Sequence, residues 1–433
     1  MKVLLSATPV SGHLNPVLNI GNILKEAGFD VLVMTAHTLR SRVEAAGLNF
    51  TATSTADDRD WIDIDATFPE RATHAPGFDQ LLFDCKHGFL DSMPGQFSGL
   101  MAVLEHFPAD AIITDSTYTG ILPFLLGARA ARPAIVAISP VPLFYRRDDG
   151  APNGPGLPPA VSAEQTAQYA ALAEGAHQAL FGPAWEYANA LLGSLGARPL
   201  PMIWPDVTVV LADAFLVPTI PSFEYPRQDL PATIRFVGAL PHAEQPLPPE
   251  LKAVIESGKK LVLVTQGTVS NTDLSQLVEP ALAALAHRED VMVLATTGGR
   301  DTSVITVRIP ANASVSRWLP LDQVLPHACA MITNCGYGTV NSALAYGVPI
   351  VGAGLSEDKP EVAARIAWSG VGIDLKTDRP TVEQLRDAAN ALLDEPRFYQ
   401  RAQEIAREYR AFNASALIPH IIKETVAAHV AAH

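Results

Sequence analysis

Residues 330–340 read AMITNCGYGTV, and this stretch decides the fold of the second half of the chain. An apolar run ends at Thr333, and Gly336 and Gly338 precede a helix that we expect to begin at Thr339. The amides of a helix N-terminus, approached closely beside glycine, suit a phosphate or a diphosphate. A tight turn followed by a threonine N-cap gives the same pattern. The surrounding sequence must therefore decide between a phosphate site and a plain turn.

Strand and helix patterns alternate around this stretch. Two amphipathic helices are predicted at 382–394 and 396–411. The apolar runs that predict strands are 261–265, 291–295, 330–333, 349–351 and 372–375. This alternation is typical of a doubly wound sheet of parallel strands, so we expect an α/β domain.

The first half of the chain shows the same alternation. Residues 3–7 predict a strand, 8–15 a loop, and apolar residues from Val17 onward recur at helical spacing. A tract rich in Pro, Gly and Asp, 147–161, predicts a surface loop. Further strand candidates are 31–34, 111–114, 134–137 and 207–211. These elements predict a second open parallel sheet.

A proline-rich tract separates the two halves, because proline fixes φ and removes hydrogen-bond donors. We expect an N-terminal domain at 1–240, a linker at 241–250, a C-terminal domain at 251–410 and a tail at 411–433 that packs back on the first domain. Two such domains would face a central cleft, where the carboxyl ends of their strands bind ligands.

Composition narrows the function classes. The chain has 433 residues, 48% of them hydrophobic and 18% charged, which excludes disordered and fibrous classes. The net charge of −14 would repel nucleic acid and anionic lipid, so we expect neither as a partner. No signal peptide or membrane span is visible, which predicts a cytoplasmic protein. The three cysteines form no Cys-x-x-Cys pair, and we expect no metal site.

Two residues could contact a sugar nucleotide. Trp318 follows a short strand candidate at 314–316, where an indole face could stack on a base. Asp358 follows the strand at 349–351, where it could accept hydrogen bonds from sugar hydroxyls. Taken alone, Trp318 is more often a core residue, and Asp358 with Lys359 is more often a solvated loop pair.

The order of these features resembles the donor-binding signature of family 1, the UDP-sugar-using glycosyltransferases of GT-B fold. The residues that carry the resemblance are Trp318-x-Pro320, His327, 334–339, Gly347-Val348-Pro349 and Asp358. Residues 11–16, SGHLNP, look like the acceptor-side loop of that family, and 223–226 and 236–238 look like its bacterial, macrolide-transferase-like branch. The resemblance covers nearly the whole chain.

The resemblance implies roles for the donor-side residues. Trp318 would stack on uracil, Asp358 would orient the sugar hydroxyls, and Thr268 would contact phosphate from the opposite side. The diphosphate would be held by Gly336, Gly338 and Thr339. No cofactor is implied beyond the nucleotide sugar as co-substrate, and none of these contacts requires a metal.

Four positions depart from the family pattern. Asn334 stands where the family usually has histidine, and it could still donate a hydrogen bond to phosphate. Ser342 replaces a common acidic residue, while Leu321 and Lys359 replace glutamines. Lys359 could favour an acidic sugar, or it could pair with Glu357 or Asp358. The identity of the donor sugar therefore stays open, although UDP-glucose is the first expectation.

Transfer of a sugar to a hydroxyl needs a general base, and histidine suits this task. His13 lies in the Gly-His-x-x-Pro pattern of the family, and Asp115, directly after the strand at 111–114, matches the dyad partner. A carboxylate fixes the tautomer of a histidine base. Asp115 could instead cap the helix that follows it. The resemblance implies inversion at the anomeric carbon.

The acceptor is expected to be a lipophilic or aromatic small molecule bound by the N-terminal domain. Candidates for its apolar wall are Trp61, Phe68, Phe83, Phe89, Phe144, Tyr145 and Trp185, and many of them could be core residues. Two rival functions stay open: a sugar-nucleotide epimerase of the same fold, and a non-catalytic partner that activates another enzyme. An oligomer is compatible with the sequence. A dehydrogenase is disfavoured because residues 8–13 lack Gly-x-Gly-x-x-Gly.

Overall fold

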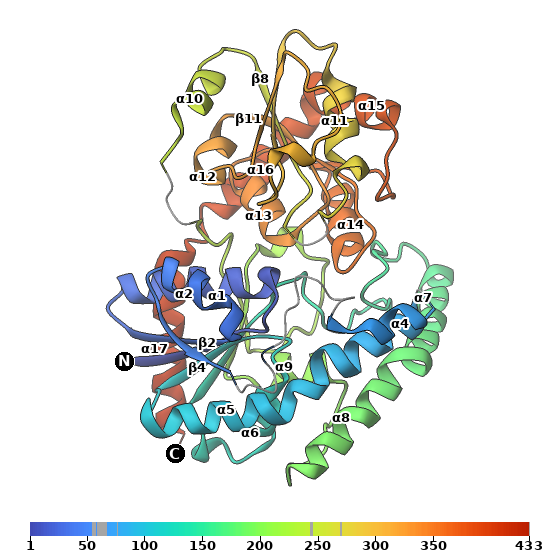
Figure 1. Ribbon diagram of the computed structural model, residues 1–433. Coiled ribbons are helices and arrows are strands. Elements are labelled where there is room, and N and C mark those ends of the chain that lie inside the picture. Colours follow the sequence, from blue (N-terminus) through green and yellow to red (C-terminus); the bar gives the residue numbers. More distant parts are fainter. Residues whose placement is uncertain (54–57, 59–66, 76, 243–245, 269–270, 433) are drawn as a thin grey trace.

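The chain folds into two α/β domains, each built on a sheet whose strands are all parallel (Figure 1). The computed structural model describes residues 1–53, 58, 67–75, 77–242, 246–268 and 271–432. The strand order is β3-β2-β1-β4-β5-β6-β7 in the first domain and β10-β9-β8-β11-β12-β13 in the second. The expected α/β architecture of two doubly wound sheets is therefore confirmed.

The first sheet spans most of the first half of the chain. Its strands are β1 (Lys2–Ser6), β2 (Asp30–Thr35), β3 (Asn49–Ala52), β4 (Ala111–Asp115), β5 (Ala134–Ile138), β6 (Ala214–Val217) and β7 (Ile234–Phe236). The α-helices of this half are α1 (Ser11–Glu26), α2 (Arg40–Ala45), α4 (Phe78–Phe83), α5 (Met93–His106), α6 (Leu122–Leu126), α7 (Ala163–Ala176), α8 (Gly182–Ser194) and α9 (Trp204–Leu211). Two π-helical turns, η4 (Asp84–Phe89) and η8 (His177–Phe181), follow α4 and α7.

The second sheet lies between residues 260 and 374. Its strands are β8 (Lys260–Thr265), β9 (Val291–Thr296), β10 (Ala313–Ser316), β11 (Ala328–Thr333), β12 (Ile350–Gly352) and β13 (Gly372–Asp374). The helices of this half are α10 (Pro249–Ile255), α11 (Val278–Leu285), α12 (Leu321–Val324), α13 (Tyr337–Ala345), α14 (Lys359–Ser369), α15 (Val382–Asp394), α16 (Pro396–Tyr409) and α17 (Ala414–Ala431).

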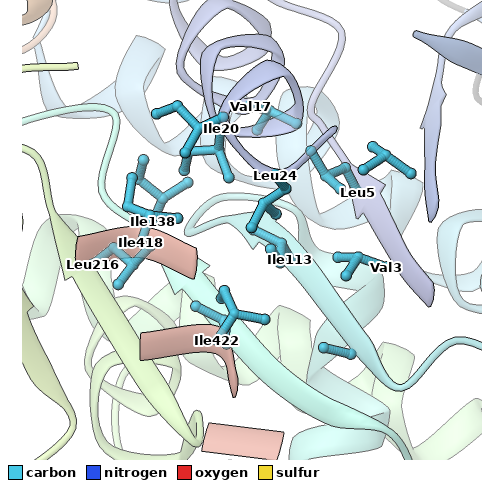
Figure 2. Packing of buried hydrophobic residues seen from close by; sticks show 14 of the residues in the cluster. Val3, Leu5, Val17, Ile20, Leu24, Ile113, Ile138, Leu216, Ile418 and Ile422 are labelled. Carbon is cyan, nitrogen blue, oxygen red and sulfur yellow. The ribbon is translucent and has the colours of Figure 1, made fainter. Parts of the chain in front are cut away.

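Successive side chains of the central strands point to opposite faces of the first sheet, so the core of the first domain has one part on each face. Val3 and Leu5 pack with α1 in one cluster, and Leu4 packs in the cluster on the other face. The last helix of the chain joins the first of these clusters, where Ile418 and Ile422 lie beneath the strands (Figure 2). The C-terminal helix α17 is therefore part of the core of the N-terminal domain.

Two local predictions in the first half of the chain are wrong. Residues 207–211 belong to helix α9 and not to a strand, because Pro205 occupies the first turn and Asp206 complements the helix dipole there. The expected loop at 8–15 is shorter than predicted, because α1 begins at Ser11. His13 therefore lies in the first turn of a helix, while Pro16 lies inside that helix and leaves one carbonyl without its intrahelical partner.

Candidate active site

His13 and Asp115 meet at the carboxyl edge of the first sheet. Strands β1 and β4 are neighbours with Ser6 opposite Thr114, so the segments that follow them emerge side by side. His13 Nδ1 lies 3.0 Å from Asp115 Oδ1. The Asp115 side chain is fully buried, and that of His13 is 14% exposed. A buried carboxylate therefore holds the inner nitrogen of a partly exposed imidazole.

Two threonines complete the surroundings of Asp115. The backbone amide of Thr8 donates to Oδ2 at 2.6 Å, and the amide of Thr117 donates to Oδ1 at 3.0 Å. The Thr117 hydroxyl lies 2.5 Å from Asp115 Oδ1 and 2.9 Å from His13 Nδ1. Burial raises the pKa of Asp115. The hydrogen bond and charge of His13, together with the hydrogen bonds from Thr117 and Thr8, outweigh burial and keep this pKa below its usual range. Asp115 both faces His13 and caps the turn that follows it, so the two readings of this residue coexist.

The glycine loop lies between β11 and α13 in the second domain. Gly336 is the N-cap of α13, and Thr339 is the third residue of the helix and not its first. Cys335 adopts a left-handed backbone with φ 69°, which turns the chain sharply out of the buried strand. A Cβ added at Gly336 or Gly338 would meet nothing within 4 Å. Open space therefore adjoins the backbone amides at the start of α13.

Asn334 connects this loop to the end of the neighbouring strand β8. Its Nδ2 donates to the carbonyl of Gln266 at 2.6 Å, and its Oδ1 is buried without a hydrogen-bond partner among the described residues. A cavity of about 250 Å³ lies beside it, lined by Gln266, Thr272, Gln276, Leu277, Asn334, Ala353, Gly354, Ser356, Lys359 and Asp378. Thr268, on the loop after β8, is exposed. The structure thus brings Asn334 and Lys359 to one cavity at the carboxyl edge of the second sheet.

Trp318 is a surface residue and not part of the core. The residue is 57% exposed, and it lies against Gly299, where an added Cβ would be 2.5 Å from the indole Cζ2. Lys359 differs, because its side chain is only 5% exposed and forms an ion pair with Glu357. Its Nζ also lies 3.2 Å from Ser356 Oγ. The positive charge of Lys359 is therefore compensated by Glu357, in the loop that precedes α14.

Asp358 is the N-cap residue of α14. Burial raises the pKa of Asp358 to about 6, although the charges of Lys359 and, more weakly, His13 lower it. The charge of His13, in the first domain, is thus one of the weaker influences on Asp358, in the second.

Comparisons with known proteins identify the family of the chain. Residues 280–425 match the family described as "Erythromycin biosynthesis protein CIII-like, C-terminal domain". UDP-glycosyltransferase 2 of Phaeomoniella chlamydospora is 37% identical over 441 residues, covering 98% of this chain and 96% of that protein. UDP-glucosyltransferase A1 of Starmerella bombicola is 31% identical over 434 residues, covering 99% and 92%.

The chain belongs to the UDP-glycosyltransferase family. The resemblance found in the sequence is thus confirmed, and the protein is a glycosyltransferase. A solved structure, the glycotransferase of kitacinnamycin, shares the GT-B architecture with a TM-score of 0.71 and 21% identity, covering 98% of each chain. Over the described part of this glycosyltransferase, no group of three or more His, Cys, Asp or Glu side chains could hold a metal ion. No described helix is both long and apolar enough to cross a membrane.

Sequence reasoning missed several neighbours of the dyad in this glycosyltransferase. Thr8 and Thr117 carry only weak sequence signals, a threonine after a strand and an Asp-Ser-Thr run. The Phe89 ring lies 6.3 Å from that of His13, and the Trp204 ring lies 5.9 Å from Phe89. Of the expected apolar wall, Phe89 thus adjoins His13, while Trp61 lies outside the described residues. Trp204, the first residue of α9, was not predicted.

Proposed function

We propose that this glycosyltransferase moves the glucosyl group of UDP-glucose to a hydroxyl of a lipophilic or aromatic natural product, with inversion at the anomeric carbon. The observation that carries the proposal is the hydrogen bond between His13 and the buried Asp115 at the carboxyl edge of the first sheet. The second domain contributes the glycine loop and the cavity beside Asn334 and Lys359 at the carboxyl edge of its own sheet. Closure around both substrates would exclude water and align the reacting atoms.

His13 is proposed as the general base. Asp115 would hold the Nδ1 proton, so Nε2 would accept the proton of the acceptor hydroxyl. The acceptor oxygen would form a bond to the anomeric carbon while the bond from that carbon to the diphosphate oxygen breaks. The leaving UDP takes the electron pair, and the ionised Asp115 stabilises the imidazolium. Attack opposite the leaving group inverts the anomeric centre.

The donor would be held by the second domain without a metal ion. The amides at Gly336, Gly338 and Thr339 would bind the diphosphate at the start of α13, with Thr268 and Asn334 at the adjoining loop. The exposed face of Trp318 would stack on uracil. Asp358 would accept hydrogen bonds from sugar hydroxyls, with Lys359 next to it at the start of α14.

The choice of a neutral hexose follows from two observations. Lys359 is already paired with Glu357, so its charge gives little preference for a uronic acid. A full-length relative is named a UDP-glucosyltransferase, which supports glucose as the sugar. The match to an erythromycin biosynthesis family supports a natural-product acceptor. A panel of UDP-sugars including UDP-glucuronic acid tests this choice, and a preference for the acidic sugar would contradict it.

The decisive experiment compares His13→Ala with the intact protein. Aromatic aglycones are incubated with UDP-glucose, and the glycosides and released UDP are measured by mass spectrometry. Loss of the base should lower the rate about 10²- to 10⁴-fold. His420→Ala is the matched control, because the His420 side chain is 66% exposed on α17 and pairs with Glu424 of the same helix.

The same assay separates the rival functions. A transferase releases UDP in step with glycoside formation, and release depends on the acceptor. Interconversion of the UDP-sugar without an acceptor would indicate the epimerase. No turnover with any acceptor would favour the non-catalytic partner, and equal product from the intact protein and His13→Ala would remove the assigned base.

A further inference from the structure

The surface loop at 147–161 reaches across the domain boundary and docks on the first turn of α14. The backbone amides of Gly154 and Gly156 donate to Glu361 Oε1 at 2.8 and 3.0 Å. A Cβ added at Gly156 would lie 2.3 Å from the carbonyl oxygen of Pro360, so the loop backbone touches the helix. Figure 1 shows α14 at the edge of the second domain that faces the first, close to the loop leading into α7.

A buried ion network continues this contact behind the helix. Arg365 is fully buried, and its guanidinium pairs with Glu361 at 2.7 Å and with Glu224 of the first half of the chain at 2.9 Å. Glu224 Oε1 in turn accepts a hydrogen bond from the amide of Leu143 at 2.9 Å. The carboxylates of Glu361, on α14, and of Glu224, in the first half of the chain, thus both pair with the buried guanidinium of Arg365.

An aromatic ring joins the loop to the same cation. The Tyr225 ring lies 4.2 Å from the guanidinium carbon of Arg365 and 4.6 Å from that of Arg147. Arg147 also donates to the carbonyl of Leu157 at 2.5 Å, which anchors the loop to its own base. Arg147, at the base of the loop, and Arg365, on α14, therefore both pack against the Tyr225 ring.

A fully buried ion network is seldom the most stabilising way to fill such a space, since apolar side chains of similar volume often do as well. What it supplies is one defined geometry, because each charge must meet its partner. Ile220 and Phe223, next to Glu224, pack in the core of the second domain, whereas Glu224 itself accepts the hydrogen bond from Leu143 of the first domain. This segment therefore links α14 to the first domain.

We propose that the docked loop and the ion network of Glu224, Glu361 and Arg365 set the position of Asp358 relative to the first domain. Asp358 directly precedes α14, so a shift of the first turn moves its carboxylate. Glu361 and Arg365 are then positioning residues for sugar transfer, acting through Asp358. The inference rests on the proposed function, because that function assigns Asp358 to the sugar.

Gly156→Ala tests the docking contact. The added methyl group meets Pro360, so the loop must move away from α14. Gly196→Ala is the matched control, because φ is 69° at Gly196 and 68° at Gly156, yet nothing lies within 4 Å of the Cβ added at Gly196. Both substitutions carry similar backbone strain, and only one adds a clash.

The expected result is a split between catalysis and binding. Gly156→Ala should lower kcat about tenfold to a hundredfold relative to Gly196→Ala, because a small misplacement of reacting groups is costly. The Kd for UDP should stay within about twofold, because α13 and Trp318 are untouched. A kcat within about twofold of the control, or an equal loss of UDP affinity, would overturn the inference. Should Gly156→Ala fail to fold, Glu361→Gln carries the same test, since it keeps the shape and removes the charge.

Hydrogen exchange separates this inference from the proposed function. The amides of Gly154 and Gly156 should exchange slowly in the intact protein and in Gly196→Ala, and rapidly in Gly156→Ala. If no sugar is transferred by any form of the protein, the proposed function fails while this measurement still reports on docking. Equally fast exchange in all three proteins would show that the loop does not dock.

Discussion

At the scale of single residues, two carboxylates at this site are tuned in opposite directions. Hydrogen bonds from His13, Thr117 and Thr8 outweigh burial at Asp115 and lower its pKa. At Asp358 burial dominates, and the pKa rises to about 6. Asp115 is therefore ionised throughout the physiological range, whereas Asp358 changes its charge just below neutral pH.

The raised pKa of Asp358 predicts how donor binding depends on pH. Below about pH 6 the carboxyl is protonated and accepts hydrogen bonds from sugar hydroxyls less well, so the KM for UDP-glucose should rise as the pH falls from 7.5 to 5. In Asp358→Asn, the KM should be higher at pH 7.5 and should lose this dependence on pH. Initial rates at varied donor concentration measure both. A wild-type KM that is flat across this range would contradict the assignment of Asp358.

The same shift has a cost for the fold. A carboxyl whose pKa is raised on folding contributes stability that is complete below its unfolded pKa near 4, and that contribution is lost as the pH rises through about 6. At neutral pH the buried charge thus lowers the free energy of unfolding. Such a cost is common where a site is arranged for binding.

The residue scale also limits what the sequence could predict. His13, Asp115 and Asp358 were predicted from the motifs that resemble the family, and Asp115 and Asp358 also follow predicted strands. Thr8 and Thr117 were missed, since hydrogen bonds across 107 and 104 positions of the chain leave no local signature. The pairing of Lys359 with Glu357 was one of two readings, and periodicity could not choose between them.

At the scale of elements, a substitution at the start of α13 should affect the stability of the fold and the binding of UDP in different ways. Gly338 lies in the first turn, and a Cβ added there would meet nothing within 4 Å. Gly338→Ala should leave the free energy of unfolding unchanged or raise it by up to about 1 kcal/mol, because alanine favours the helix. It should nevertheless weaken UDP binding at least about tenfold, because the methyl group occupies the space needed for phosphate. Calorimetry and denaturant unfolding measure the two effects.

Gly193→Ala in α8 is the control for Gly338→Ala. Nothing lies within 4 Å of a Cβ added at Gly193, and the helix lies in the other domain. This substitution should bring the same gain in stability with no change in UDP affinity. Unaltered UDP binding in Gly338→Ala would place the diphosphate elsewhere.

Helices and strands could be predicted where the apolar pattern was long or bounded by clear turns, and they were ambiguous where a short apolar run stood alone. The buried strands β1, β4, β8 and β11 lie close to their expected positions, since their apolar runs are flanked by clear turns. Residues 207–211 were misassigned because five mostly apolar residues fit a strand as well as a buried helix. Proline at the first turn, and not periodicity, distinguishes α9.

At the scale of the whole molecule, the order of the chain and the division into domains do not coincide. Helix α17 comes last in the sequence and contacts α1 and β5 of the first domain. Ile220 and Phe223, from the first half, pack in the core of the second domain. Each domain therefore borrows core from the other half of the chain, a feature that local sequence patterns do not reveal.

This exchange predicts that the end of the chain stabilises the acceptor side. Ile422 is fully buried among residues of β1, β4 and α1 (Figure 2), so Ile422→Ala should lower the free energy of unfolding by about 2–5 kcal/mol. Val430→Ala lies on the same helix at a position 68% exposed, and it should change stability by less than about 0.5 kcal/mol. Ile422→Ala leaves a cavity beneath β1 and β4. The backbone amides around His13 and Asp115 should therefore exchange faster, while those in the strands of the second sheet keep their protection. Hydrogen exchange resolved by segment distinguishes this outcome from a uniform loss, which would mean that the two domains unfold as one unit.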